Sequence, residues 1–206
     1  MAENTKYISV AKTALAEITE KKSRFICNIS HAETAEDAEA FIEKIKKQHY
    51  NAKHNVYAYI LSSGAKKYTD DGEPSKTAGL PILEMLEKRS ITDVVCVVTR
   101  YFGGILLGTG GLVRAYTEAA KQGLEEAGIV TMEKCSLYEM ELPYSQLATT
   151  EHMLKKFNAA LEDKQFAQCV KLLFSVKASE SDSVINSLSD FFGTAVSITG
   201  KGQAYR

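Results

Sequence analysis

Strand-like and helical spacings of apolar residues alternate along the first half of the chain. Strand-like runs are predicted at 7–18 and 24–30, on either side of the charged turn TEKKS. Thr34 and Asp37 then have the spacing of a capping box that opens a helix. The buried face of this helix follows the i, i+3, i+4, i+7 rule at Ala38, Phe41, Ile42 and Ile45.

The next predicted elements are a strand, a polar loop, a short helix, a second strand and a long helix. The first strand covers 54–61, the loop covers 62–79, and Pro81 suits the first turn of the short helix. The run ITDVVCVVTRYF, 91–102, has a continuous β-branched centre, which is typical of a strand covered on both faces. A glycine-rich segment follows, and helical spacing then continues until Gly128 ends it.

From Cys135 onwards the predicted order of elements is β-α-β-β-α-β, which is the ferredoxin-like order. In CVKLLFSVK, apolar residues alternate with more polar ones, as expected for a sheet with one face packed on helices. A boundary within GIVTMEK, 128–134, therefore divides the chain into domains 1–130 and 131–206. Each domain mixes helices and strands, so the predicted fold class is α+β.

Composition narrows the function classes without choosing one. The 206 residues include 25 Lys or Arg and 26 Asp or Glu, a net charge of −1, so any contact with nucleic acid must be a local patch. The N-terminal residues carry charges where a signal peptide needs an apolar run. No stretch approaches the roughly 18 apolar residues of a membrane span. We therefore expect a cytoplasmic protein with no membrane partner.

Cysteine and histidine spacing predicts no metal site. The four cysteines lie far apart, in apolar or alternating segments, which favours reduced and buried thiols. No Cys-x-x-Cys or His-x-x-x-His spacing occurs, so we expect no zinc site and no other bound metal.

Five of the 13 glycines gather in TRYFGGILLGTGGLVRAY, residues 99–116, which follows a predicted strand and opens a helix. This order suggests phosphate binding, because a helix N-terminus presents free N–H groups to anions. Neither known motif fits. The P-loop needs Lys and Ser/Thr where Thr109 and Gly110 stand, and the dinucleotide fingerprint needs glycine at Val113. No nucleotide and no other cofactor is expected.

Two interpretations remain for this glycine segment. Five glycines at unusual backbone angles indicate that the backbone approaches something closely. The neighbour is either the protein itself, in tight packing of helix on sheet, or a ligand. Arg100, Tyr101 and Phe102 favour a contact surface, because an arginine beside two aromatic rings can stack on bases or receive a partner's side chain.

The stretch DDGEPSKTAGLP places Asp70, Asp71 and Glu73 close together. Carboxylates in this arrangement could hold a hard cation, yet Asp-Gly and Glu-Pro are also ordinary turn sequences. No neighbouring His or Cys base and no G-x-S-x-G nucleophile motif accompanies them. A structural turn or binding loop is therefore favoured over a catalytic site.

Together, DDGEPSKTAGLPILEML and VVCVVTRYFGGILLGTGGLVRAY resemble the signature of the IMPACT family, also called YigZ-like. The signature centres on RYFGG and is completed by the LG that follows it. Ser75-Lys76 departs from the pattern, because family members often have a smaller, glycine-containing pair there. The C-terminal part resembles the second domain of bacterial two-domain members, so the resemblance covers nearly the whole chain.

The resemblance implies a fold and a biological context. The first domain is expected to have the βαβα fold shared by a small-subunit ribosomal protein, domain IV of elongation factor G and GHMP kinases. The second is expected to be like domain V of elongation factor G. A role in translation is implied, since the eukaryotic relative binds a translational-control scaffold and restrains starvation signalling through an initiation-factor kinase.

We therefore expect a non-enzymatic binding protein that acts in translation or its regulation through RNA, the ribosome or a translation-related protein. The alternatives are an enzyme on phosphate-bearing or peptide substrates with a cation at the acidic stretch, and a small-molecule binder. No catalytic residue is assigned. The expected binding residues are Arg100, Tyr101, Phe102, Gly103, Gly104, Gly108, Gly110, Gly111, Arg114, Asp71 and Glu73. Lysines that the fold could add to them are Lys21, Lys22, Lys44, Lys47, Lys66 and Lys67.

Overall fold

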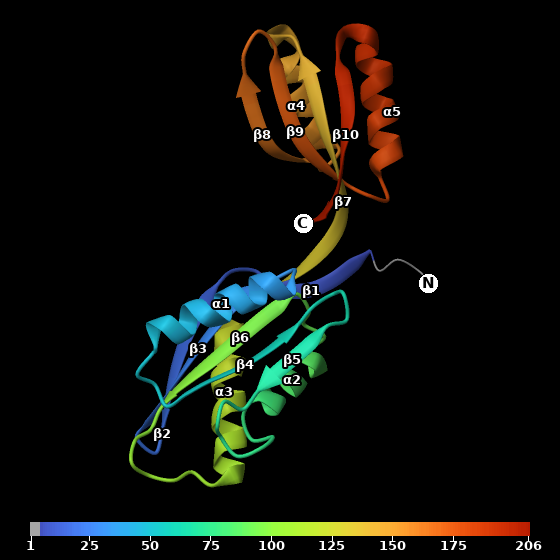
Figure 1. Cartoon of the computed structure of the whole chain (residues 1–206). Helices are drawn as coiled ribbons and strands as arrows, with labels where there is room; N and C mark the ends of the chain where they lie inside the picture. The colour runs from blue at the N-terminus through green and yellow to red at the C-terminus, as the bar shows by residue number, and fades with distance from the viewer. Residues whose placement is uncertain (1–4) are drawn as a thin grey trace. The chain divides into compact units, whose positions relative to one another are not determined.

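The computed structural model describes residues 5–206 and divides into two compact units, 7–131 and 132–206, the latter including Thr5 and Lys6 (Figure 1). Strands β1 (Lys6–Val10) and β7 (Ile129–Leu142) each extend across the division. The stretch 128–134 is therefore mostly strand rather than an irregular connection. Its backbone is hydrogen bonded on both sides, because Glu133 pairs with Arg206 and the Lys134 N–H donates to the Thr5 carbonyl.

The first unit contains a five-stranded antiparallel sheet in the order β2-β3-β6-β4-β5. These strands are β2 (Ala14–Glu20), β3 (Ser23–His31), β6 (Val94–Tyr101), β4 (His54–Ile60) and β5 (Lys66–Thr69). The sequence prediction differs from the structure at two places. The run 7–18 is broken into β1 and β2, and β5 forms inside the predicted loop. That strand lacks an apolar pattern because it is a short, mostly exposed edge strand held by backbone pairing with β4.

Helices cover both faces of this sheet: α1 (Ala35–Gln48) one face, and α2 (Gly79–Lys88) with α3 (Thr109–Ala127) the other. Along β6, Val95 and Val97 pack in the α1 cluster, while Val94, Cys96 and Val98 pack in the cluster with α2 and α3. This confirms the prediction of a strand covered on both faces. The predicted capping box at the start of α1 is also confirmed.

The second unit has the order β7, α4 (Leu147–Lys156), β8 (Ala160–Phe166), β9 (Val170–Lys177), α5 (Ser181–Phe192) and β10 (Ser197–Tyr205). Short 3-10 turns at Tyr144–Gln146 and Gly193–Ala195 precede α4 and β10. The four strands pair antiparallel in the order β10-β7-β9-β8, the arrangement of a ferredoxin-like sheet. Its apolar core joins one sheet face to α4 and α5. The two-domain α+β class is confirmed.

The cysteines are all free thiols. Cys27, Cys96 and Cys135 are buried as predicted, whereas Cys169 is half-buried. The Cys27 and Cys96 sulfur atoms lie 3.5 Å apart in the core of the first unit. The hydrogen bond to Cys27, together with burial, raises the pKa of Cys96 well above that of a free thiol, so these thiols act as small core side chains.

Candidate functional site

The glycine segment has three structural parts: the end of β6, a connecting loop at residues 102–108, and the first turns of α3. Of its five glycines, Gly104 and Gly108 have positive φ, +85° and +72°. Gly103 is needed for another reason, because a Cβ there would lie 2.0 Å from the carbonyl carbon of Lys22. Gly110 and Gly111 belong to the first turn of α3. The expectation of five unusual backbone angles is therefore wrong for three of the five.

Arg100 lies in the interior of the first unit. Its Nη1 donates to Glu73 Oε1 at 2.7 Å, and the two side chains are only 6% and 4% exposed. Its guanidinium also lies over the rings of Phe25 and Phe102, with its central carbon 5.4 and 5.5 Å from their centroids. A second donor, Nη2, is 3.4 Å from Ser23 Oγ. The guanidinium thus lies inside the fold rather than being presented to a partner, and its Nε is buried without a hydrogen-bond partner among the described residues.

Glu73 is the centre of this interior cluster. Besides Arg100, it accepts a hydrogen bond of 2.8 Å from the hydroxyl of Tyr116, a fully buried residue of α3. Burial, followed by the nearby Glu73 carboxylate, raises the pKa of Tyr116 far above its usual value, so the hydroxyl stays protonated and remains a donor. His54 Nε2 lies 3.8 Å from the same oxygen. We call Glu73, Arg100, Tyr116, His54 and Ser23 the buried network.

The two aspartates of the acidic stretch have separate structural tasks. Asp70 Oδ1 accepts hydrogen bonds from the N–H groups of Ala78 and Gly79 at 3.0 and 2.9 Å, which caps the start of α2. Asp71 Oδ2 accepts from the Asn55 N–H at 2.6 Å. The Asp71 carbonyl oxygen also accepts from His54 Nδ1, at 2.6 Å. The three carboxylates therefore serve different donors and fasten this loop to β4, β6 and α2.

Two further observations bear on the kind of site. Within residues 5–206, no three His, Cys, Asp or Glu side chains are grouped so as to hold a metal ion. In the same range, no helix has the length and apolar content to cross a membrane.

The exposed part of the signature begins at Tyr101. Its hydroxyl lies 3.0 Å from His49 Nδ1 and donates to Asn51 Oδ1 at 3.1 Å, so it is held at the end of α1. Phe102, the next residue, is 43% exposed. The Lys53 ammonium lies 5.4 Å from the Phe102 ring centroid.

The connecting loop exposes aliphatic residues as well. Ile105 is more than one-third exposed, and Leu106 is 82% exposed. Lys21 and Lys22 form the two-residue turn between β2 and β3, where they adopt φ values of +46° and +64°. Positive φ at both central residues is the geometry of a type I′ hairpin turn, although lysine adopts it less readily than glycine or asparagine.

We define the loop surface as the exposed side chains of Phe102, Ile105 and Leu106 together with Lys21, Lys22 and Lys53. Ile105, Leu106 and Lys53 are not among the binding residues expected from the sequence. Consecutive aliphatic residues between glycines were a usable signal for the first two. No signal linked Lys53 to Phe102, because their contact depends on the pairing of β4 with β6.

The other candidate lysines do not join the loop surface. Lys66 is paired with Glu87 at 2.7 Å, and Lys67 with Glu39 at 2.9 Å. Lys44 and Lys47 lie on α1, which covers the sheet face opposite α3.

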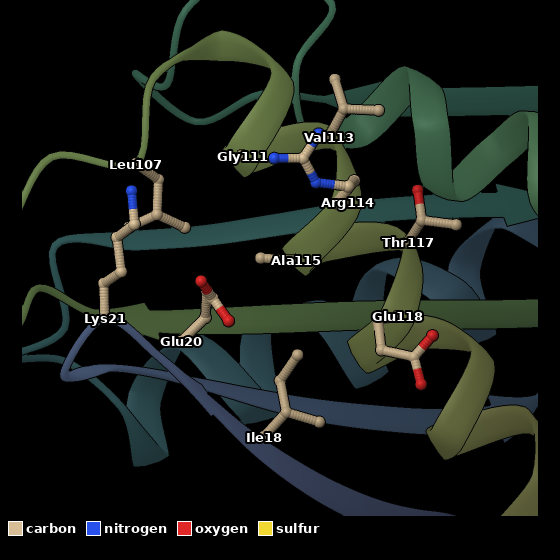
Figure 2. Close-up of a pocket in the computed structure, with 10 residues that line it drawn as sticks. All are labelled: Ile18, Glu20, Lys21, Leu107, Gly111, Val113, Arg114, Ala115, Thr117 and Glu118. Atoms are coloured by element: carbon tan, nitrogen blue, oxygen red, sulfur yellow. The ribbon is translucent and has the colours of Figure 1, made fainter.

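Arg114 is exposed and lines a pocket beside the loop, between the lysine turn and the start of α3 (Figure 2). The pocket has a volume of about 590 Å³. Its lining includes the aliphatic side chains of Ile18, Leu107, Val113 and Ala115. Charged side chains contribute to the rest of the lining, namely Lys21, Arg114, Glu20 and Glu118. The structure thus separates the two arginines of the glycine segment, one in the core and one at a pocket.

Comparison with known proteins matches both parts of the chain. The model of the Impact N-terminal domain matches residues 21–124, and a domain of unknown function, DUF1949, matches residues 140–193. The glycine segment, the acidic stretch and the loop surface all lie within the first match.

Individual relatives are similar over most of the chain. The IMPACT family member YvyE of Bacillus subtilis is 41% identical over 178 residues, which cover 85% of this chain and 82% of that protein. The IMPACT family member YigZ of Escherichia coli is 35% identical over 177 residues, 83% of this chain and 86% of that protein. The Protein IMPACT homolog of Dictyostelium discoideum is 37% identical over 97 residues, 44% of this chain and 28% of that protein.

A solved structure has the same arrangement of elements. The crystal structure of a hypothetical protein aligns with a TM-score of 0.65 and 30% identity, and covers 95% of this chain and 97% of its own. Sequence and fold agree, and the chain belongs to the IMPACT family.

Proposed function

We propose that this chain is a non-enzymatic binding protein that acts in translation or its regulation, through RNA, the ribosome or a translation-related protein. The loop surface is its contact region. The family resemblance implies the setting, since the match to the Impact N-terminal domain includes all of the loop surface and a eukaryotic relative is 37% identical over 97 residues.

The observation that carries this proposal is the exposure of Phe102, Ile105 and Leu106 on one short loop. Burying a large apolar side chain stabilises a complex by about 1.5–3 kcal/mol. Grouped exposed apolar residues with a polar rim are typical of interaction sites. The lysine turn and Lys53 supply that rim, and the buried network beneath fixes the ends of the loop.

The same network supports a binding role over an enzymatic one. Glu73 and Arg100 face each other in the interior, and Asp70 and Asp71 accept backbone hydrogen bonds. These groups would be the natural acid, base and anion-binding side chains of an active site here. Their hydrogen bonds instead stabilise the fold.

The proposal is tested by recovery of the ribosome or a translation protein from cell extract on the immobilised full chain, with and without ribonuclease. Leu106→Ser is expected to lower recovery about tenfold or more, because it removes an exposed anchor without touching the core. Leu15→Ser is the matched control, since Leu15 is 59% exposed on β2 and outside the loop surface. Equal recovery by both variants, or recovery of no translation component by the unaltered chain, contradicts the proposal.

A further inference from the structure

The pocket beside the connecting loop is not used by the proposed contact of Phe102, Ile105 and Leu106. It adjoins that contact, because Leu107 lines the pocket and directly follows Leu106. Its volume of about 590 Å³ lies within the range of sites that hold a ligand group. A partner seated on the loop therefore has a recess within reach.

The lining of the pocket defines what fits. Ile18 from β2, Leu107 from the loop and Ala115 from α3 offer aliphatic surface, which favours an apolar group. In Figure 2 the side chains of Lys21 and Arg114 extend toward the space beside Leu107. Neither cation is ion-paired with a carboxylate of residues 5–206. The guanidinium also lies back over the first turn of α3, since a Cβ at Gly110 would be 3.8 Å from its Nη1.

The charges favour a protein over a nucleic acid as occupant. Two carboxylates, Glu20 and Glu118, line the same pocket as the two cations. A phosphate backbone meets repulsion from both, whereas a peptide can place one acidic group by the cations and N–H groups by the carboxylates. No aromatic ring lines the pocket, so bases find no stacking platform there.

We infer that this pocket receives an apolar side chain of a protein partner whose adjacent residue is acidic, with the acidic group beside Lys21 and Arg114. The inference rests on the proposed function and narrows its partner to a protein. It assigns Arg114 to recognition through its charge, and Ile18 through the apolar surface of the pocket.

The test uses a displayed library of random 12-residue peptides, selected on the full chain. Selected peptides are expected to carry Leu, Ile, Phe or Met next to Asp or Glu. The best of them is then synthesised, together with a counterpart in which each acidic residue is replaced by Lys. The full chain should bind the acidic peptide at least about tenfold more tightly than its basic counterpart.

Two variants separate charge from shape. Arg114→Glu should abolish or reverse the preference for the acidic peptide, and Ile18→Ala should weaken binding of both peptides by removing apolar surface from the pocket. Lys88→Glu is the matched control, because it makes the same charge change on an exposed residue of α2 that does not line the pocket. It should leave the preference as it is.

Other results overturn the inference. These are selected peptides without acidic residues, or a preference that Arg114→Glu does not change. A third is binding of a fluorescent 12-nucleotide oligouridylate to the full chain that the Arg114→Glu substitution abolishes. Such binding would indicate RNA in the pocket. If recovery of translation components still depends on Leu106 in that case, only the pocket inference fails. If that dependence is absent, the proposed function itself fails.

Discussion

The loop surface of the first unit and the open sheet face of the second use charged residues in opposite ways. On the open face of the second sheet, cations pair with carboxylates of neighbouring strands: Lys171 with Glu141, and Lys201 with Glu139. Around the loop, Lys21 and Lys22 have no carboxylate partner within the described part of the chain. Exposed apolar side chains accompany them.

The number of charges therefore does not identify an interaction surface. Both regions carry several cations in a chain whose net charge is −1. The tyrosine and phenylalanine of the central strands, Tyr138 and Phe174, stack on each other at the helix side of the second sheet. The open face therefore lacks, within the described strands, the central aromatic platform that RNA-binding sheets use. Ion pairing and burial, rather than the number of charges, distinguish the loop surface from the open sheet face.

The largest expected effect comes from breaking the buried ion pair under the loop surface. Arg100→Ala leaves the Glu73 carboxylate buried without its cation, which should lower the free energy of unfolding by about 3–5 kcal/mol. Lys171→Ala, which breaks a half-exposed pair in the other region, should cost at most about 1 kcal/mol. Urea denaturation of both variants measures this. Similar losses would show that the two regions do not differ as described.

A smaller effect is expected from the other donor to Glu73. Tyr116→Phe keeps the ring and its edge-on contact with Phe25, but removes the hydrogen bond to the carboxylate. The free energy of unfolding should fall by about 1.5–3 kcal/mol, as for a hydrogen bond to a charged group. Tyr68→Phe, on a partly exposed tyrosine of β5, is the control and should change it little. An unchanged urea midpoint for Tyr116→Phe would contradict the assigned role of this hydroxyl.

The smallest expected effect is on the pH dependence of stability, through His49, which contacts Tyr101 between the buried network and the loop surface. Burial, followed by the charge of Arg24, lowers the pKa of His49 below 6.5 in the folded protein. The His49 imidazole therefore binds a proton more readily in the unfolded chain than in the folded one. The stability that neutral His49 contributes is fully present above about pH 6.5 and falls as the pH drops through that value. His49→Gln should lose less stability than the unaltered chain between pH 7.5 and 5.5, measured by urea midpoints. An identical loss in both proteins would exclude this contribution.

Much of the fold could be predicted because its signals are local. The capping box at Thr34, the stop at Gly128 and the continuous apolar run of β6 each act within a few residues. Edge strand β5 could not be predicted, because backbone pairing with β4 holds it and its side chains carry no apolar pattern.

Most of the order of elements, the family and the segment that carries the candidate site could be predicted from the amino-acid sequence. Which residues of that segment are available to a partner depends on the tertiary structure. Arg100 and Glu73 are 27 positions apart, and their contact requires β6 and the acidic loop to meet in one place. The ion pair is buried and desolvated in the interior, whereas Leu106, six residues after Arg100, lies on a loop outside the core and stays exposed. Spacing along a chain does not encode such a division, because burial is set by neighbours that are distant in sequence.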